Sequence, residues 1–295
     1  MNLGRAKSIL IIAFIGLNLF LGYHLFWPDF GRLTSVAVTA EEMRITEAIL
    51  KNNNYFLEAS LDRAIQTSDF LTVSSTSDIQ MQIMGRLIEK GALVQEFEGA
   101  LVYITTGETT VFNSSGLTQI LYDPGIFIAE DSINLELSEL KNLVEQFINE
   151  KELMPEGIVF DYLEKTEAGD MILYYYQVLD NMPIFAGQLK VIIESDNIKA
   201  VEIYWLKLIE RGPVREMEVI SATEALTNLV KGLGPNSEPR MINRIDLGYF
   251  SGEYDAEKWE IPPVWRVVLD GQDCYYINAF TGNLEQDSII PKQLP

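Results

Sequence analysis

The sequence predicts an α+β protein with an N-terminal single transmembrane helix, followed by extracytoplasmic domains of antiparallel sheets that are each packed with a helix. Two observations carry this prediction. An apolar run without Asp, Glu, Lys or Arg occupies residues 8–27. After it, one capped amphipathic helix followed by several short strands occurs twice. Consecutive strands joined by short turns form antiparallel meanders, and a helix can then cover one face of each sheet.

The run at 8–27 has the length of a membrane-spanning helix. Twenty helical residues rise about 30 Å, which matches the hydrocarbon core of a bilayer. Arg5 and Lys7 precede the run without an acidic neighbour, and cations on one side of a span hold that side in the cytoplasm. These two residues are the predicted topology determinants, with residues 1–7 cytoplasmic and the later domains extracytoplasmic. No second run approaches this length, so we expect a single-pass protein of the cell membrane.

A cleaved secretory signal is the alternative interpretation of the same run. The apolar region of a signal peptide spans about 7–15 residues, and cleavage follows soon after it. Here the run is longer, and the first suitable small-residue site, Val38-Thr39-Ala40, lies well beyond its end. The uncleaved anchor is therefore favoured.

Asn18 is a polar residue in the middle of the predicted span. A side-chain amide in lipid tends to find a partner on another helix, and a glycine such as Gly22 lets a partner backbone approach closely. We predict that the anchor contacts a partner helix through Phe14, Leu17, Asn18, Leu21 and Gly22. Alternatively, Asn18 is simply tolerated in lipid, because polar contacts between membrane helices average only about 0.6 kcal/mol.

The predicted N-terminal extracytoplasmic α+β domain spans residues 28–130. The Thr39–Glu42 capping box begins its first helix, which ends near Asn52. Asp78 begins the second helix and Gly91 ends it, with an inward stripe of Ile79, Ile83, Met84, Leu87 and Ile88. Strands are expected at 101–105, 109–112 and 117–122, and residues 123–131 are expected to form a junction.

Two further units follow, at 131–210 and at 211–287, with a tail at 288–295. In the first, a helix over 138–153 with Leu140, Val144, Phe147 and Ile148 on one face precedes four strands, at 158–163, 172–179, 184–193 and 199–206. In the second, a capping box at Ser221 begins a helix that Gly234 ends, and strands follow at 241–250, 264–269 and 274–280.

Composition excludes several classes of function. The net charge of −21 repels phosphate backbones, so the sequence predicts no nucleic-acid binding. The single histidine, His24, lies at the end of the predicted span, so no Ser-His-Asp, Cys-His or histidine-zinc site can form outside the membrane. We therefore predict no enzyme, no metal and no cofactor. A hydrolase with two catalytic carboxylates is a weaker hypothesis, because none of the many acid pairs is singled out.

Cys274 is the only cysteine, so the chain cannot form an intrachain disulfide. It lies in a strand-like run beside Tyr275 and Tyr276. A small buried hydrophobe is the favoured interpretation, because no neighbouring cation in sequence would lower the thiol pKa and activate it.

Short motifs in a common order extend along most of the chain: Arg5-x-Lys7-x-Ile9, Leu17-Asn18-Leu19-Phe20-Leu21, Tyr176-Gln177, Met182-Pro183-Ile184-Phe185, Trp265-Arg266-Val267 and 275–282. Together they make the chain resemble the YycI family of membrane-anchored regulatory proteins in Gram-positive bacteria. The last motif also resembles the closing strand of PepSY-type domains.

The resemblance implies a regulatory role and no reaction. YycI-like proteins act with a paralogue, YycH, on the WalK-type sensor histidine kinase that controls cell-wall metabolism, partly through transmembrane helices. It therefore implies a sensor histidine kinase and a YycH-like paralogue as partners, and a helix contact at Asn18 suits this role. The alternative is an anchored PepSY-like binding module that inhibits or retains a secreted peptidase or a wall ligand.

Overall fold

The computed structural model describes Phe14 and residues 38–285, except 63, 65, 76–77, 167, 180, 213–216 and 253–255. This part of the chain is a mixed α+β structure, as predicted, but most of its strands form one large sheet with two parallel pairings where separate antiparallel sheets were expected. Within the described residues, no helix is both long and apolar enough to cross a membrane. The predicted span at 8–27 lies outside these residues apart from Phe14, so the transmembrane helix stays a prediction.

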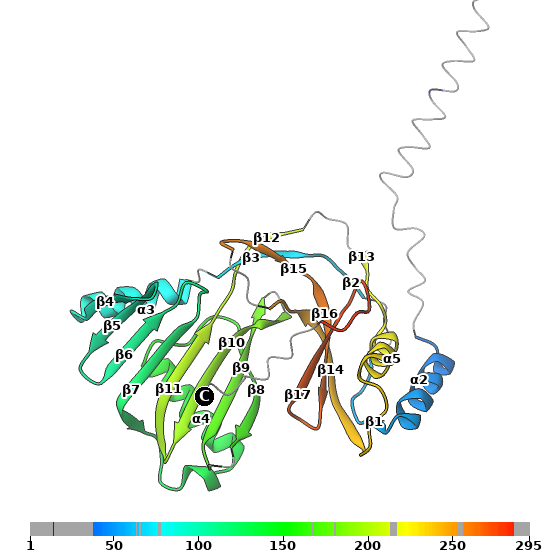
Figure 1. Cartoon of the computed structure of the whole chain (residues 1–295), viewed down its shortest axis with the longest axis horizontal. Coiled ribbons are helices and arrows are strands. Elements are labelled where there is room, and N and C mark those ends of the chain that lie inside the picture. Colours follow the sequence, from blue (N-terminus) through cyan, green and yellow to red (C-terminus); the bar gives the residue numbers. More distant parts are fainter. Residues whose placement is uncertain are drawn as a thin grey trace, which may run out of the picture.

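The large sheet has two halves that share strand β10 (Met182–Glu194) (Figure 1). The first half is antiparallel throughout. Its strands run in the order β4 (Leu93–Phe97), β5 (Ala100–Thr105), β6 (Glu108–Phe112), β7 (Thr118–Phe127), β11 (Asn197–Tyr204), β10, β9 (Met171–Leu179) and β8 (Ile158–Lys165).

The second half contains β1 (Tyr55–Leu57), β14 (Arg240–Tyr249), β16 (Pro263–Leu269) and β17 (Asp273–Asn278). β14 pairs with β16, and β16 with β17, in antiparallel orientation, whereas β1 pairs with β14 in parallel. The two halves meet where Ile184 of β10 pairs with Tyr249 of β14. Beyond this point β10 and β14 diverge, because a register shift between Ile184 and Gln188 turns β10 toward β9 and β11.

Two small sheets lie above the junction in the view of Figure 1. One contains β12 (Lys207–Arg211), β3 (Leu71–Ser74) and β15 (Trp259–Ile261), and the other pairs β13 (Met217–Glu218) with β2 (Thr67–Ser68). Leu71, Val73 and Ile261 of the first small sheet share a core cluster with Ile184 of β10 and Tyr249 of β14. This cluster therefore buries apolar surface from both halves and joins them.

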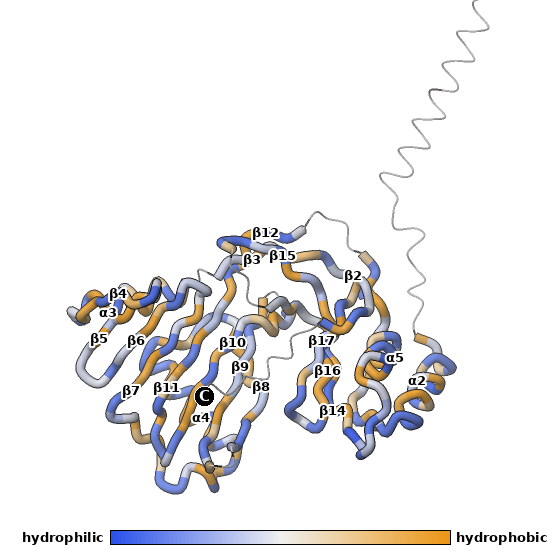
Figure 2. Tube along the Cα trace, in the orientation of Figure 1, coloured by the Kyte–Doolittle hydropathy of each residue, from blue (hydrophilic) through white to orange (hydrophobic). Residues whose placement is uncertain are grey.

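Four α-helices are described, two for each half. Buried residues of α3 (Asp78–Glu89) and α4 (Leu137–Glu150) share one core cluster with the first half of the sheet. Those of α2 (Ala40–Asn52) and α5 (Ala222–Leu233) share another with the second half. Hydrophobic and hydrophilic residues alternate along many of the strands, as expected when one face of a sheet is covered (Figure 2).

Most predicted helices are confirmed. Thr39 and Glu42 form the reciprocal capping box that begins α2, and Ser221 caps α5. The predicted face of α4, Leu140 to Ile148, is buried. The stripe of α3 is wrong at one position, because Ile88 is 61 % exposed while Ile79, Ile83 and Leu87 are buried.

The strand predictions missed several elements. β1, β2, β3, β4, β12, β13 and β15 were not expected, and β7 continues to Phe127 through the segment predicted to be a junction. Residues of the predicted 28–130 domain join both halves, since β1 pairs with β14 and β7 pairs with β11. The domain boundaries themselves stay predictions.

Gly248 lies where β10 crosses β14. A Cβ atom at this position would lie 2.6 Å from the Pro183 carbonyl oxygen and 2.6 Å from the Phe185 ring. Only glycine permits this approach, because the Pro183 oxygen belongs to the backbone and cannot swing away as a flexible side chain could. Gly85 on α3 is the opposite case, with nothing within 4 Å of the added atom.

We therefore expect Gly248→Ala to lower the free energy of unfolding by about 1–3 kcal/mol through overpacking at the crossing. Gly85→Ala should raise it by about 0.5–1 kcal/mol, because alanine favours a helix interior. Urea unfolding of both variants measures the two changes. Equal effects of the same sign would contradict the importance of the crossing.

Candidate functional site

The residues predicted to form the site in the membrane lie outside the described part of the chain, with one exception. Arg5, Lys7, Leu17, Asn18, Leu21 and Gly22 are not described, whereas Phe14 is helical and 64 % exposed. The partner-helix contact therefore stays a prediction. The described residues contain three other features with functional potential, two at the junction of the halves and one at the far end of the first half.

The first feature is an ion cluster that bridges the two halves, which we call the junction lock. It comprises Asp161 of β8 in the first half and Arg244, Asp246 and Arg266 in the second. Arg266 Nη1 donates to Asp161 Oδ2 at 2.7 Å and Nη2 to Asp246 at 3.2 Å. Arg244 binds Asp161 as well, and its Nε lies 2.9 Å from Asp246.

Arg266 is the central residue of the junction lock. Its side chain is only 2 % exposed, and its guanidinium carbon lies 4.0 Å from the Phe185 ring centroid and 5.2 Å from that of Tyr176. Both rings belong to the first half, so Arg266 contacts that half through charge and through aromatic faces. Its Nε finds no acceptor within the described residues, which places an unmet hydrogen-bonding group at the junction.

Burial at the junction also shifts the pKa values of nearby titratable side chains. It raises the pKa of Tyr276, and it raises the pKa of the Cys274 thiol, although the positive charge of Arg266 opposes both shifts. A thiol with a raised pKa is mostly protonated at neutral pH and is a weak nucleophile. This agrees with the expectation that Cys274 is unreactive, but the residue is half-buried where a buried one was expected.

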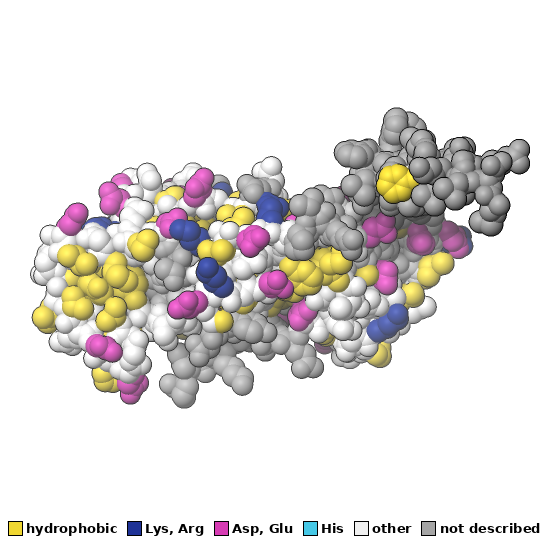
Figure 3. Space-filling view, turned by 90° about the horizontal axis from the view of Figure 1, so that it is seen from above, with side chains coloured by type: hydrophobic (Ala, Val, Ile, Leu, Met, Phe, Trp, Pro, Cys, Tyr) yellow, Lys and Arg dark blue, Asp and Glu magenta, His cyan; other side chains and the backbone are white. Residues whose placement is uncertain are grey.

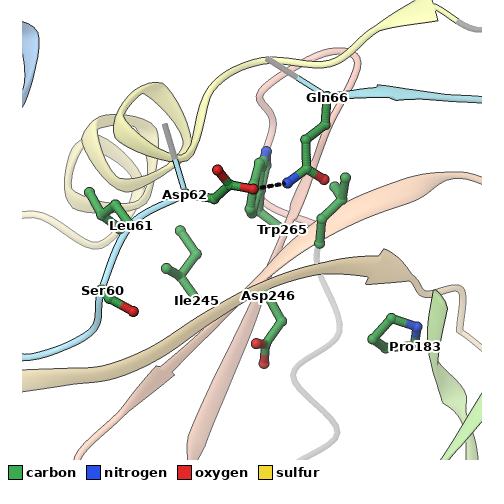
Figure 4. Close-up of a pocket in the computed structure, with 9 residues that line it drawn as sticks. Ser60, Leu61, Asp62, Gln66, Pro183, Ile245, Asp246 and Trp265 are labelled. Carbon is green, nitrogen blue, oxygen red and sulfur yellow. Dashed lines mark hydrogen bonds between the residues drawn. The ribbon is translucent and has the colours of Figure 1, made fainter. Parts of the chain in front are cut away.

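The second feature is a pocket beside the lock, which we call the junction pocket. It has a volume of about 390 Å³ and is lined by Ser60, Leu61, Asp62, Gln66, Pro183, Ile245, Asp246, Leu247 and Trp265. Leu61 and Ile245 lie on one side of β14, whereas Asp246 points to the other side (Figure 4). At the rim, Gln66 donates to Asp62 at 2.9 Å. Asp246 belongs to both the pocket and the lock.

The third feature is an exposed apolar surface formed by α3 and β4, which we call the α3–β4 corner. Apolar side chains gather at this end of the molecule (Figure 3). They are Met81 and Ile88 of α3, at 59 % and 61 % exposure, and Leu93 and Phe97 of β4, at 59 % and 66 %. Val94, at 48 %, points to the opposite face of β4 from Leu93 and Phe97. Isolated exposed apolar residues are ordinary, but a contiguous group of them marks an interaction surface.

Strand β4 adds a second property to this corner. It is the end strand of the sheet, and all five of its residues are exposed. Proteins usually protect such edges with lysine, proline or a bulge. β4 has none of these, since its sequence is Leu-Val-Gln-Glu-Phe and its pairing with β5 has no register shift. At the opposite end of the sheet, by contrast, the returning chain at 283–285 bonds to β17.

The sequence alone did not reveal these features. Trp265, Arg266 and Tyr276 were noted as family motifs, but nothing in their neighbourhood pointed to Asp161, about a hundred residues earlier. One residue of the corner, Ile88, was noticed in the sequence, but it was assigned to the buried stripe of the helix. Tyr175 is buried in the core cluster that contains α3 and α4, whereas its neighbour Tyr176 is half-buried against the junction cluster.

A model of the YycI protein family matches residues 34–280, which cover most of the chain. The chain belongs to the YycI family. This membership confirms the resemblance and indicates a regulatory accessory protein of the YycG/WalK two-component system. Comparison with curated proteins gives no match.

The fold of this YycI-family chain is similar to a solved structure. That structure is the crystal structure of an uncharacterized protein from Eubacterium rectale ATCC 33656, with a TM-score of 0.50 and 12 % sequence identity. The alignment covers 80 % of this chain and 92 % of the other. At this identity the likeness concerns the fold alone.

Breaking the junction lock should be costly. We expect Asp161→Ala to lower the free energy of unfolding by about 3 kcal/mol or more, because it leaves the buried Arg266 charge partly uncompensated. The double variant with Arg266→Met should lose less than the sum of the single changes. Urea unfolding of the four proteins in this cycle gives the coupling. Glu41→Ala, which breaks an exposed pair with Arg44, is the control and should change stability by less than about 1 kcal/mol.

Proposed function

We propose that the chain is a membrane-anchored accessory regulator of a sensor histidine kinase that controls cell-wall metabolism, and that it acts with a YycH-like paralogue. Its membership of the YycI family is the observation that carries this proposal. The described domains would lie outside the cell, anchored by the span at 8–27. The charge of −21 suits a soluble exterior domain and disfavours association with anionic surfaces.

Two contacts would make the chain a regulator. In the membrane, the face formed by Phe14, Leu17, Asn18, Leu21 and Gly22 would pack against a helix of the kinase complex. Such a helix shifts a two-state kinase only by the difference between its binding free energies for the two states. Outside the membrane, a second contact would hold the complex together and fix the register of the anchor.

The α3–β4 corner is the surface that supports this second contact. Its apolar side chains and its open strand edge suit a partner that adds a strand to β4 and covers Met81 and Ile88. We assign it to the YycH-like paralogue. A second copy of this chain is less suitable, because each copy carries a charge of −21, and Glu96 lies on β4 with Glu98 in the turn that follows it.

The membrane contact predicts a change in kinase output. Replacing the span by an unrelated transmembrane helix should uncouple regulation, and Asn18→Leu should do so in part, because each removes the differential contact with the partner helix. Transcription from a kinase-controlled promoter in the native bacterium measures both. A photo-crosslinking residue at position 17 or 21 identifies what the helix touches.

The control for the anchor is the amount and folding of the exterior domain. Normal output after the swap would contradict the membrane contact. An exterior fragment that keeps full activity when detached from the membrane would instead favour the alternative, an anchored PepSY-like module that binds a secreted peptidase or a wall ligand.

The exterior contact predicts that Phe97→Lys weakens the complex with the paralogue by at least about tenfold, because it places a charge on the open strand edge and removes apolar contact area. Co-purification from membranes and the affinity of the purified pair measure this. Leu121→Lys is the matched control, since Leu121 is 48 % exposed on β7 away from the corner. Equal loss of affinity for the two variants would contradict the assignment of the corner.

A further inference from the structure

The face of the first half that points away from α3 and α4 carries a row of apolar side chains, which we call the open-face stripe. The row crosses six neighbouring strands, from β5 to β9, and each member lies directly opposite the next on the adjacent strand. In spatial order its members are Ile104, Thr109, Leu121, Ala200, Ile192 and Ile172. All but the threonine are apolar.

The core residues of the same strands show which face the stripe occupies. Each stripe residue is one position away from a residue of another row, and that row belongs to the core cluster shared with α3 and α4. The core row includes Tyr103, Ile120, Val201, Val191 and Leu173. Because successive side chains of a strand point to opposite faces, the stripe points away from these helices. α2 and α5 pack on the second half.

No described element covers the stripe. None of its residues belongs to a core cluster of the described part of the chain. Leu121 is 48 % exposed, and Ile104, Ile172 and Ile192 are half-buried. The free face of an antiparallel sheet is usually polar, and a contiguous apolar group on it marks an interaction surface. Six strands spaced by about 4.8 Å give the stripe a length of about 24 Å.

The row on one side of the stripe is polar at its centre, and its side chains bind one another. Gln119 donates to Glu202 at 3.0 Å, and Lys190 Nζ lies 3.5 Å from the same carboxylate. These groups already have partners on the sheet. The apolar surface over the central strands is therefore only about one residue wide, so it suits a narrow, rod-like partner.

The other side of the stripe is acidic. Asp123 and Glu194 are exposed, and each follows a stripe residue by two positions with one residue of the helix-covered face between them. Within the described residues neither carboxylate forms an ion pair. Glu164, which lies opposite Ile172, ends the row on β8. Lys199, at the register shift of β11, offsets only one of these charges.

We propose that the open-face stripe binds an amphipathic helix of a partner protein, with basic residues along one flank. A helix of about 16 residues spans 24 Å, and its narrow apolar edge matches a single row of side chains. The basic flank approaches Asp123 and Glu194, and the net charge of −21 favours such a partner. An extended segment is less suitable, because the central strands are paired on both edges and offer it no free backbone groups.

This proposal is independent of the regulatory role proposed above. The stripe adjoins the α3–β4 corner, since Leu93 lies opposite Ile104, but the two surfaces share no residue. A strand added to β4 extends the sheet at its edge, whereas the helix lies on the face of the sheet.

The test places a photo-crosslinking residue at position 104 or 172, the two ends of the stripe, in the full-length chain in the native bacterium. Mass spectrometry then maps the captured sites. We expect both positions to capture one segment of one protein, at sites about 16 residues apart, with apolar residues at helical period and lysine or arginine on one flank. Sites about seven residues apart would indicate an extended segment and overturn the proposal. So would two unrelated segments, capture of this chain itself, or no protein adduct.

The acidic border is tested by neutralising it. The double variant Asp123→Asn, Glu194→Gln should lower capture from position 104 by about threefold or more, because two exposed charge contacts are lost. Glu47→Gln with Glu238→Gln makes the same change in net charge at exposed sites of the second half and should leave capture unchanged. Equal losses in the two double variants would contradict a basic flank at this border.

Leu121→Lys tests the apolar edge. It places a charge in the middle of the stripe and should lower capture from position 104 at least about tenfold, while the exposed site lets the chain fold normally. The complex with the paralogue should stay intact in this variant, so a failure of the stripe and a failure of the corner give different results. Unchanged capture would overturn the proposal.

Discussion

The architecture depends on strand β10, which pairs with strands of both halves of the large sheet. β10 pairs with β9 and β11 over most of its length and touches β14 only at Ile184. This is possible because Gly248 lets the Pro183 backbone approach β14 closely, and because Gly187 leaves room for Gln177, which bonds both backbone groups of Leu206. Where β10 diverges from β14, the junction pocket lies between Pro183 and β14, and the junction lock attaches the two halves to each other.

Local signals in the sequence were sufficient for much of this fold. Thr39, Ser221 and Gly234 mark helix ends through capping chemistry that acts within a few residues. The face of α4 follows from its helical period, and the four strands from β8 to β11 follow from alternation and short turns. In each case the information lies within one element and its neighbours, so a single sequence carries it.

Contacts between distant segments were beyond such signals. β1 pairs in parallel with β14, nearly two hundred residues later in the chain. Parallel strands are not joined by a hairpin turn, so no local motif in the sequence indicates this pairing. The short strands β2, β3 and β15 pair with segments that are distant in the sequence and that only the fold places beside them. Asp161 was one acid among 43, and only the fold places it against Arg266. Ile88 fits the helical stripe yet is exposed, since period alone does not say how wide a face the sheet covers.

If the proposed anchor displaces α2, the contacts of the second half provide a physical route from α2 to the junction. α2 packs against α5 and β1, β1 pairs with β14, and β14 carries Arg244 and Asp246 of the lock. A displacement of α2 would therefore reach β14 and the junction lock before it reaches the first half. α2 acts on β14 through β1, and the junction pocket and the junction lock both include residues of β14. The attachment of the two halves is therefore the contact whose strength a movement of α2 would change first.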